Sequence, residues 1–469
     1  MKTLLKCFDL RMYSKEQRNQ FIFNIILGLS VLLFFTLLRD TSVRQNYINT
    51  YFDYFIKFRL DSYTDTKAVS QEIVFLDFDD ISLYELNRPS ITPRDKVAEL
   101  IELAYMGGAK IIIPDMDFSE SDYSPEMFFA GDELALDGQS RDRVLFNLLE
   151  RIKKDFTSQT KVLLPLTAYS DRTLKKNIFC PLIDNKKIFE VTPTFTTGKF
   201  IDSSVRFWMP YMEVKEDLQA PLRILWSIPL LTCVLVNGDV DELRNLESTI
   251  IDSDTEIFTL NVLRNNEVEE FHFYKEYSDS EGLIRDSSAG QYNRIQYVMI
   301  PPDINFQSPF GNISESRIGH WRKTGVDNKR IDFKNKIVII GRADKDCGDF
   351  FRTSVGNLPG MYVHGNSIAT IMGKTQPHLS SPYKHAFVEI LLIIIAAYAF
   401  LCLSQFKAKC LIVSLTVLCW IFTYVYFCFT NEFLYLSFAF TVIGVYNFAN
   451  SIQNFIVRGV SIRRLLRRR

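Results

Sequence analysis

The sequence lacks the marks of several protein classes. Its formal net charge is -1 over 469 residues, so it has no overall positive field that would attract nucleic acid. It has eight cysteines without any Cys-x-x-Cys spacing, and only Cys180, Cys233 and Cys347 lie away from the apolar ends of the chain. This scattered set indicates neither a disulfide framework nor a zinc site. We therefore expect no metal, no other cofactor and no nucleic-acid partner.

The common catalytic motifs are also missing. The chain contains no nucleophile elbow, no HExxH pair and no GxxxxGK[ST] phosphate loop, which are the short patterns that most directly indicate hydrolases, zinc proteases and nucleotidases. The sequence therefore favours a protein that is not an enzyme.

Long apolar runs are what the chain does have. Hydrophobic residues make up 47% of it, and they concentrate near both ends. Four runs are each about long enough to cross a bilayer as a helix: residues 21–38, 386–403, 410–429 and 433–448. A cleaved signal peptide is the alternative for the first run, but that run is long and no small-x-small site follows it. We predict a bundle of four transmembrane helices.

Basic residues predict the orientation of these helices. Lysines and arginines precede the first run, occupy the loop at 404–409 and follow the last run, as expected for cytoplasmic segments. Residues 1–20 and the tail 449–469 should then be cytoplasmic, with 39–385 outside, in a bacterial inner membrane. The tail arginines are predicted to bind anionic lipids or a cytoplasmic partner: Arg463, Arg464, Arg467, Arg468 and Arg469.

Residues 39–385 show alternating strand and helix patterns. Short apolar runs at 72–78, 109–115, 161–166 and 336–341 predict strands. Helical patterns lie between them, at 142–153 and after Thr92-Pro93, and a further helix is expected at 363–372. This order predicts an α/β domain with a parallel sheet. Residues 190–335 are less regular and read as a β-containing insertion, with one apolar helix at 222–236 that Pro229 would kink or break.

Polar residues follow several of the predicted strands. Because ligands bind beyond the carboxyl ends of parallel strands, the candidate ligand-binding residues are Asp77, Asp79, Asp115, Asp117, Arg342 and Asp349. The carboxylates suit a cation or a ligand amine, or general acid–base chemistry. The alternative is that they cap helices, lie in solvated loops, or pair with Arg94 or Arg342. His364 is expected to be a packed or capping residue.

Polar residues also occur inside the apolar runs. Glu389 is expected to lie near the headgroups, with a contact to Asn24 across the bundle as the alternative. Asn24 and Ser30 are candidates for contacts between helices.

Three stretches resemble a known family. They are EIVFLDFDDISLYELN at residues 72–87, ITPRDKVAELIELAYMGGAKIIIPDMDFSE at 91–120 and FKNKIVIIGRADKDCGDFFRTSVGNLPGMYVHGNSIATIM at 333–372. In this order and between these apolar runs, they resemble the opening and closing blocks of a CHASE2 domain. The family usually has an Asp and an Arg after its first span, here Asp53 and Arg59. Its DGVVRR stretch appears only as residues 202–206, and residues 240–335 have no clear counterpart.

The resemblance implies a sensory receptor. An outer domain would detect a small ligand or an envelope signal, and residues 53–59 would couple it to the membrane helices. Similar receptors continue into a cyclase or kinase domain, whereas this sequence stops soon after its last apolar run, so we expect a separate cytoplasmic or membrane output protein. A homodimer is expected by analogy. The alternatives are a structural or effector protein that organises an envelope assembly, or an envelope enzyme using Asp77, Asp79, Asp115 and Asp117.

Overall fold

The computed structural model divides into two compact units, which we describe separately. The α/β unit is Ile56–Pro377, and the bundle unit is Met1–Phe55 with His378–Arg469. The structure describes residues 13–37, 42–59, 72–87, 89, 91–119, 141–175, 179–193, 195–196, 205, 207–237, 240–252, 257–264, 267–274, 295, 313–314, 332–344, 349–373, 378–434, 436, 441–447 and 449.

The α/β unit is built on one parallel sheet of six strands. Their order is β11-β1-β12-β2-β3-β4, and every neighbouring pair is parallel. The strands are β1 (Ile73–Phe78), β2 (Ile111–Pro114), β3 (Lys161–Pro165), β4 (Ile188–Val191), β11 (Ile313–Ser314) and β12 (Ile337–Arg342). The predicted parallel α/β core is confirmed.

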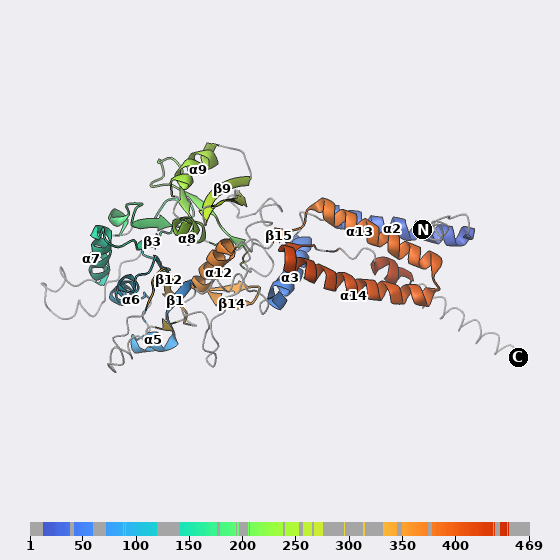
Figure 1. Cartoon of the computed structure of the whole chain (residues 1–469), viewed down its shortest axis with the longest axis horizontal. Helices are drawn as coiled ribbons and strands as arrows, with labels where there is room; N and C mark the ends of the chain where they lie inside the picture. The colour runs from blue at the N-terminus through green and yellow to red at the C-terminus, as the bar shows by residue number, and fades with distance from the viewer. Residues whose placement is uncertain are drawn as a thin grey trace. The chain divides into compact units, whose positions relative to one another are not determined.

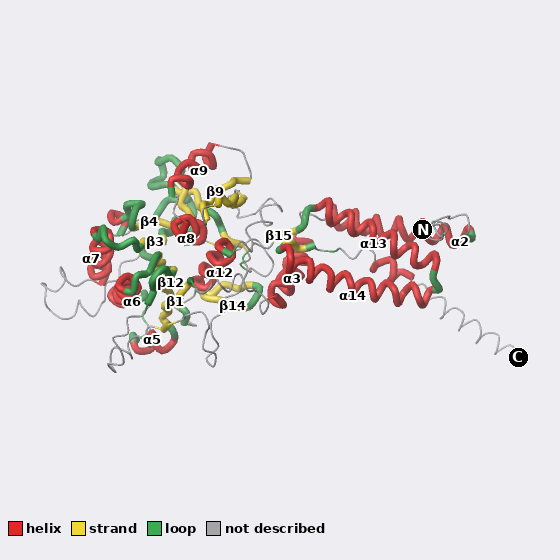
Figure 2. Tube along the Cα trace, in the orientation of Figure 1, coloured by secondary structure: helices red, strands yellow, loops and turns green. Residues whose placement is uncertain are grey.

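Helices cover both faces of this sheet (Figures 1 and 2). Because side chains alternate along a strand, Ile112 and Ile340 point to the face covered by α6 (Arg94–Met106) and α7 (Arg141–Lys154). Ile113 and Ile339 point to the other face, under α8 (Ile228–Asn237) and α12 (Gly360–Met372). Both faces are buried, which explains why the strands read as continuous apolar runs.

Two predicted helix boundaries need correction. Helix α6 starts at Arg94, with Pro93 at the N-cap and no side-chain cap from Thr92. The apolar stretch at 222–236 is not one broken helix: it forms strand β8 (Arg223–Trp226) and then α8, in which Pro229 is the second residue. Proline is well tolerated in the first helical turn, because the amide there has no partner within the helix.

The insertion supplies small antiparallel pairs and a helix. The pairs are β5 (Phe195–Thr196) with β6 (Phe207–Trp208), β7 (Tyr211–Val214) with β8, and β9 (Ile257–Arg264) with β10 (Glu267–Tyr274). A further antiparallel pair, β13 (Phe350–Thr353) with β14 (Gly356–Pro359), lies between β12 and α12. The inserted helix is α9 (Asp241–Asp252), and a short 3-10 turn, η3 (Cys180–Leu182), precedes β4.

Three helices of the bundle unit are long and apolar enough to cross a membrane. They are α2 (Lys15–Leu37), α14 (Gln405–Thr430) and the part of α13 (Pro382–Cys402) from Tyr383 onwards. The helices α13 and α14 are joined by residues 403–404 alone, a shorter link than predicted. Asn431, in the left-handed conformation at φ 59°, ends α14, as Asn often does at a helix C-terminus.

The predicted fourth span at 433–448 is not helical from its beginning. Strand β16 (Glu432–Phe433) pairs in parallel with β15 (His378–Leu379), and the helical residues described in this segment begin at Thr441. Leu434, Leu436 and Ile443 pack with residues of α2, α13 and α14, so the segment belongs to the bundle.

Polar and small residues join the helices of the bundle. Asn447 donates to the side-chain oxygen of Asn24 at 3.2 Å and accepts from Gln20 at 2.8 Å. Glu389 is fully buried, but the partner of Asn24 is Asn447, so the suggested Glu389–Asn24 contact is wrong. Ser30 is exposed, and its side chain makes no hydrogen bond to another helix among the residues that the structure describes. Gly28 allows close packing, because a Cβ there would lie 2.7 Å from Ile393.

Candidate functional site

A cavity lies at the point in the sheet where neighbouring strands are followed by helices on opposite faces. Strand β12 leads to α12 on one face, whereas its neighbours β1 and β2 lead to α6 and α7 on the other. Such a switch point opens a crevice at the carboxyl ends of the strands. The cavity there has a volume of about 420 Å³ and is lined by Ile91, Thr92, Arg94, Asp115, Met116, Asp117, Thr167, Pro193, Arg342, Asp349, Phe351, Gly360 and His364.

Asp115 is the most deeply buried carboxyl group of this cavity. It directly follows β2, and its backbone amide donates to Ile340 of β12 at 2.7 Å. Its side chain is 9% exposed, with Oδ1 3.5 Å from Nε2 of His364. Its Oδ2 has no hydrogen-bond partner among the residues that the structure describes. Burial, together with the nearby carboxylate of Asp349, holds the pKa of Asp115 well above its usual range.

Asp349 brings a second acidic group to the same space. It precedes β13, and its backbone carbonyl accepts from the amide of Gly360 at 2.9 Å. A Cβ on Gly360 would lie 2.4 Å from Oδ2 of Asp349, so only glycine leaves room for this carboxyl group at the start of α12. Burial raises the pKa of Asp349 to about 6, although a hydrogen bond from Gly360 acts in the opposite direction.

His364 lies one turn into α12 and is 1% exposed on its side chain. Burial lowers its pKa to about 3, against a hydrogen bond to the backbone of Pro193 that acts to raise it. The imidazole is therefore neutral at pH 7, and its contact with Asp115 joins two uncharged groups when that acid is protonated.

Both arginines of the cavity are directed to other acceptors. Arg342 donates from Nε and Nη2 to the two carboxylate oxygens of Asp344, each at 2.8 Å. Arg94 donates to the backbone oxygen of Asp117 at 2.5 Å and lies 3.8 Å from the carboxylate of Asp142. Its guanidinium also lies over the ring of Phe118, at 4.6 Å. Asp344, which binds Arg342, is not one of the candidate carboxylates that were expected to pair with an arginine.

The structure brings together four of the six candidate residues. Asp115, Asp117, Arg342 and Asp349 line the cavity, but Asp77 and Asp79 do not. Asp79 instead caps α5 (Asp80–Glu85), where its Oδ1 accepts from the amide of Ser82 at 2.8 Å. The sheet explains the division, because β12 runs between β1 and β2 and separates their ends. This cavity therefore contains two of the four carboxylates of the enzyme hypothesis, Asp115 and Asp117.

The side chain of Asp117, at the edge of the cavity, is hydrogen-bonded to other residues of the protein. Its Oδ1 accepts from the amide of Ser119 at 2.8 Å and from the hydroxyl of Thr167 at 3.3 Å. Thr167 follows β3, so the rule that selected the acidic residues would also have selected it. His364 had no such signal, because its position depends on how α12 packs across the sheet.

A second cavity of the α/β unit, of about 510 Å³, is a weaker candidate. Three of its charged residues pair with each other: Arg223 donates to Glu190 at 2.8 Å and lies 2.7 Å from Glu216. A ligand would have to replace these contacts. Among the described residues, no cluster of three or more His, Cys, Asp or Glu side chains is arranged to hold a metal ion.

An aromatic cluster marks the junction where helix α3 (Ser42–Arg59) meets the bundle. Phe52 is fully buried and stacks on Phe433 with ring centres 4.5 Å apart, and it meets Phe427 edge-on at 5.4 Å. Phe55 stacks on Trp420 at 5.4 Å. The predicted coupling residue Asp53 is half-buried on the same helix. Arg59 is the last residue of α3, and its side chain lies outside the described residues.

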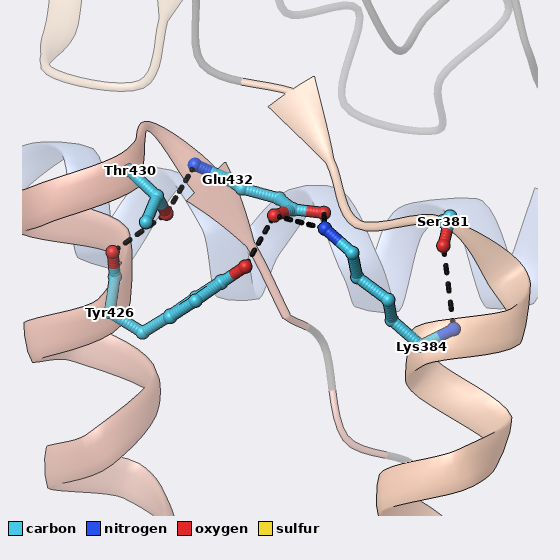
Figure 3. A network of polar contacts seen from close by, with 5 residues as sticks. All are labelled: Ser381, Lys384, Tyr426, Thr430 and Glu432. Carbon is cyan, nitrogen blue, oxygen red and sulfur yellow. Dashed lines mark hydrogen bonds and ion pairs between the residues drawn. The ribbon is translucent and has the colours of Figure 1, made fainter.

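Charged residues at the same junction form a compact network (Figure 3). The carboxylate of Glu432 accepts from the ammonium group of Lys384 at 2.9 and 3.0 Å. It also accepts from the hydroxyl of Tyr426. These contacts join the starts of α13 and β16 to the end of α14. The arginines from 463 to 469 lie outside the described part of the chain.

The fold and the site together define a class. A parallel α/β unit with a cavity at its switch point is linked in one chain to helices long enough to cross a membrane, which is the construction of a membrane-attached binding domain. The family model for the CHASE2 domain matches residues 29–402. The chain therefore belongs to the CHASE2 family, which comprises sensory extracellular domains. No curated protein and no solved structure matches it.

Proposed function

We propose that this chain is a membrane receptor whose CHASE2 domain lies outside the cytoplasm and binds a small ligand in the switch-point cavity. The observation that carries the proposal is that cavity, with the buried carboxyl group of Asp115 on its wall. Burying an acidic group without full hydrogen bonding costs stability. Such a group is more readily explained by a ligand than by folding alone.

Helix α12 offers a route from the cavity to the membrane. Its first turns supply Gly360 and His364 to the cavity wall, and the chain leaves its end at Met372. Strand β15 begins soon afterwards at His378, where it pairs with β16 in the junction. A ligand that favours one position of α12 would thus bias the junction through the intervening chain, provided that it binds two arrangements unequally.

The membrane helices would carry this bias to a separate output protein. The basic residues before α2, between α13 and α14 and in the tail support a cytoplasmic location for those segments. The receptor would then face outwards with its α/β unit, as in a bacterial inner membrane.

A blocking substitution tests the proposed function. The full-length protein in detergent micelles would be dialysed against a low-molecular-mass filtrate of growth medium and cell extract. Its thermal midpoint would be followed by the fluorescence of the buried Trp208 and Trp226. We expect the filtrate to raise the midpoint of the wild type. Thr167→Trp, which fills the cavity, should abolish the rise.

The matched control is Gln159→Trp, which adds the same side chain at an exposed position of the α/β unit. This variant should respond as the wild type does. A rise that persists in Thr167→Trp, or no rise in the wild type with any filtrate, would contradict binding in this cavity.

A further inference from the structure

The cavity also indicates which kind of ligand it takes. We propose that the ligand carries a protonated amine, which is bound between the carboxyl groups of Asp115 and Asp349. This inference rests on the proposed function and specifies the chemistry of the same site.

The first observation is the free oxygen of Asp115. Its Oδ2 is buried and has no hydrogen-bond partner among the described residues, while Oδ1 faces His364 at 3.5 Å. A buried carboxylate oxygen is an acceptor that favours a charged donor. A ligand ammonium group supplies three donors and the opposite charge.

The second observation is the nearby Asp349, whose negative charge acts on Asp115. Two carboxyl groups in one buried space repel an anionic ligand, and they attract a cation or share a proton. The empty volume of about 420 Å³ beside them suits a small organic molecule. A bare metal ion fits less well, because no cluster of three or more potential ligands is arranged for one in the described chain.

No positively charged side chain of the cavity wall takes the place of the ligand ammonium group beside these carboxyl groups. The guanidinium group of Arg342 is bound to Asp344 at 2.8 Å, and that of Arg94 to the backbone of Asp117 at 2.5 Å. His364 is neutral at pH 7, because burial lowers its pKa to about 3.

The amine would compete with protons for the same oxygens. Burial raises the pKa of Asp349 to about 6 and holds that of Asp115 well above its usual range, so protons must leave these carboxyl groups when the amine binds. Affinity should therefore fall as the pH falls, by up to about tenfold per pH unit for each carboxyl group that must lose its proton. The other titratable or charged groups at the cavity are Asp115, Asp117, His364, Arg94 and Arg342, and only the carboxyl groups favour the bound ammonium.

Three small probes of similar size separate charge from shape. The full-length protein in micelles would be titrated with n-butylammonium, n-butanol and butyrate at constant ionic strength and pH 7.5, and its thermal midpoint recorded. We expect n-butylammonium alone to raise the midpoint. Asp115→Asn should increase its half-saturating concentration by about ten- to a hundredfold, as expected for loss of a charged hydrogen bond.

Asparagine resembles the protonated acid in shape, so Asp115→Asn should fold. The control is Asp241→Asn, which removes an equal charge from an exposed position, 84% accessible on its side chain, and should leave the titration unchanged. Asp349→Asn should weaken binding as Asp115→Asn does. An equal response to n-butanol, an unchanged titration in Asp115→Asn, or displacement of n-butylammonium by calcium at lower concentration would overturn the amine assignment.

The filtrate experiment distinguishes the two proposals. If the filtrate raises the midpoint in a way that Thr167→Trp abolishes, while n-butylammonium has no effect, the receptor proposal stands and the amine assignment is wrong. If neither filtrate nor n-butylammonium has an effect that Thr167→Trp abolishes, the proposed function itself fails.

Discussion

The carboxyl group of Asp349, on the cavity wall, makes the stability of the protein depend on pH. Burial raises its pKa from 3.8 to about 6, so the folded protein binds a proton there more tightly than the unfolded chain does. This group therefore makes the protein less stable as pH rises from about 4 to about 6. His364 acts in the opposite sense, because its lowered pKa of about 3 makes the protein less stable as pH falls below 6.5.

Asp349→Asn isolates the contribution of Asp349, since asparagine cannot ionise. At pH 7 the variant should be more stable than the wild type by up to about 3 kcal/mol, and near pH 4 the two should be equal. The thermal midpoints of both proteins, measured across this pH range, check the prediction. A variant that is less stable than the wild type at pH 7 would contradict the raised pKa, because it would show that contacts in the folded protein stabilise the carboxylate of Asp349.

The sequence predicted part of the site at the residue scale. The rule that ligands bind beyond strand ends found Asp115, Asp117, Arg342 and Asp349, because each follows a strand of the parallel sheet. The same rule also selected Asp77 and Asp79, which do not line this cavity. The strand order in the sheet, with β12 between β1 and β2, cannot be read from the chain order.

At the scale of elements, the sequence did not predict α3, nor the shorter helices α5 and α9. The residues of α3 mix aromatic and polar types without a clean apolar face, and its burial depends on α14 and β16. The sheet strands were readily predicted because both faces are buried, which produces continuous apolar runs such as residues 336–341. The helix predicted at 433–448 starts too early, because an apolar run can form a buried strand as well as a helix. Here the run begins in strand β16.

The aromatic contacts of α3 predict a large effect of Phe52→Ala. Phe52 is fully buried between Phe427 and Phe433, so the substitution should cost the bundle about 3–5 kcal/mol. Tyr54→Ala, at a position 53% exposed on the same helix, should cost little. Thermal unfolding of both variants, followed by the fluorescence of Trp420, measures the difference. Equal midpoints would show that α3 does not depend on this contact.

The network around Glu432 predicts a local effect. Glu432→Ala removes the acceptor of Lys384 and Tyr426 and should cost about 1–3 kcal/mol, because the Tyr426 hydroxyl and the Lys384 ammonium group both lose a charged hydrogen bond. Hydrogen exchange at residues 378–384 should accelerate. Glu150→Ala breaks an exposed pair with Lys154, in which the side chains are 43% and 71% exposed, and should have no comparable effect. Unchanged exchange in Glu432→Ala would contradict a structural role of the network.

At the scale of the whole molecule, the order of apolar and basic segments predicts a topology. In a cysteine-free background, an impermeant thiol reagent should label Gln159→Cys in intact cells, because residue 159 is exposed on the α/β unit. A cysteine added after Arg469 should be labelled only after permeabilisation. If only α2, α13 and α14 cross the membrane, the tail lies outside the cell. Labelling of the tail in intact cells would therefore show that the segment from 441 onwards does not cross.

The family and the α/β core could be read from the sequence, whereas the cavity could not. Two blocks, each of apolar strands and a helix, in this order and between the apolar runs, indicate CHASE2, and the match over residues 29–402 confirms it. The cavity depends on which face each connection takes and on how α12 packs near Asp115, and these are properties of the assembled sheet.

The central claim is that occupancy of the switch-point cavity is transmitted to the membrane junction. Hydrogen exchange of the full-length protein in lipid nanodiscs, with and without the filtrate, tests it most directly. We expect slower exchange at 112–118 and 357–364 together with altered exchange at 378–384 and 426–434, and neither change in Thr167→Trp. Slower exchange at the cavity with no change at the junction in the wild type would contradict the relay.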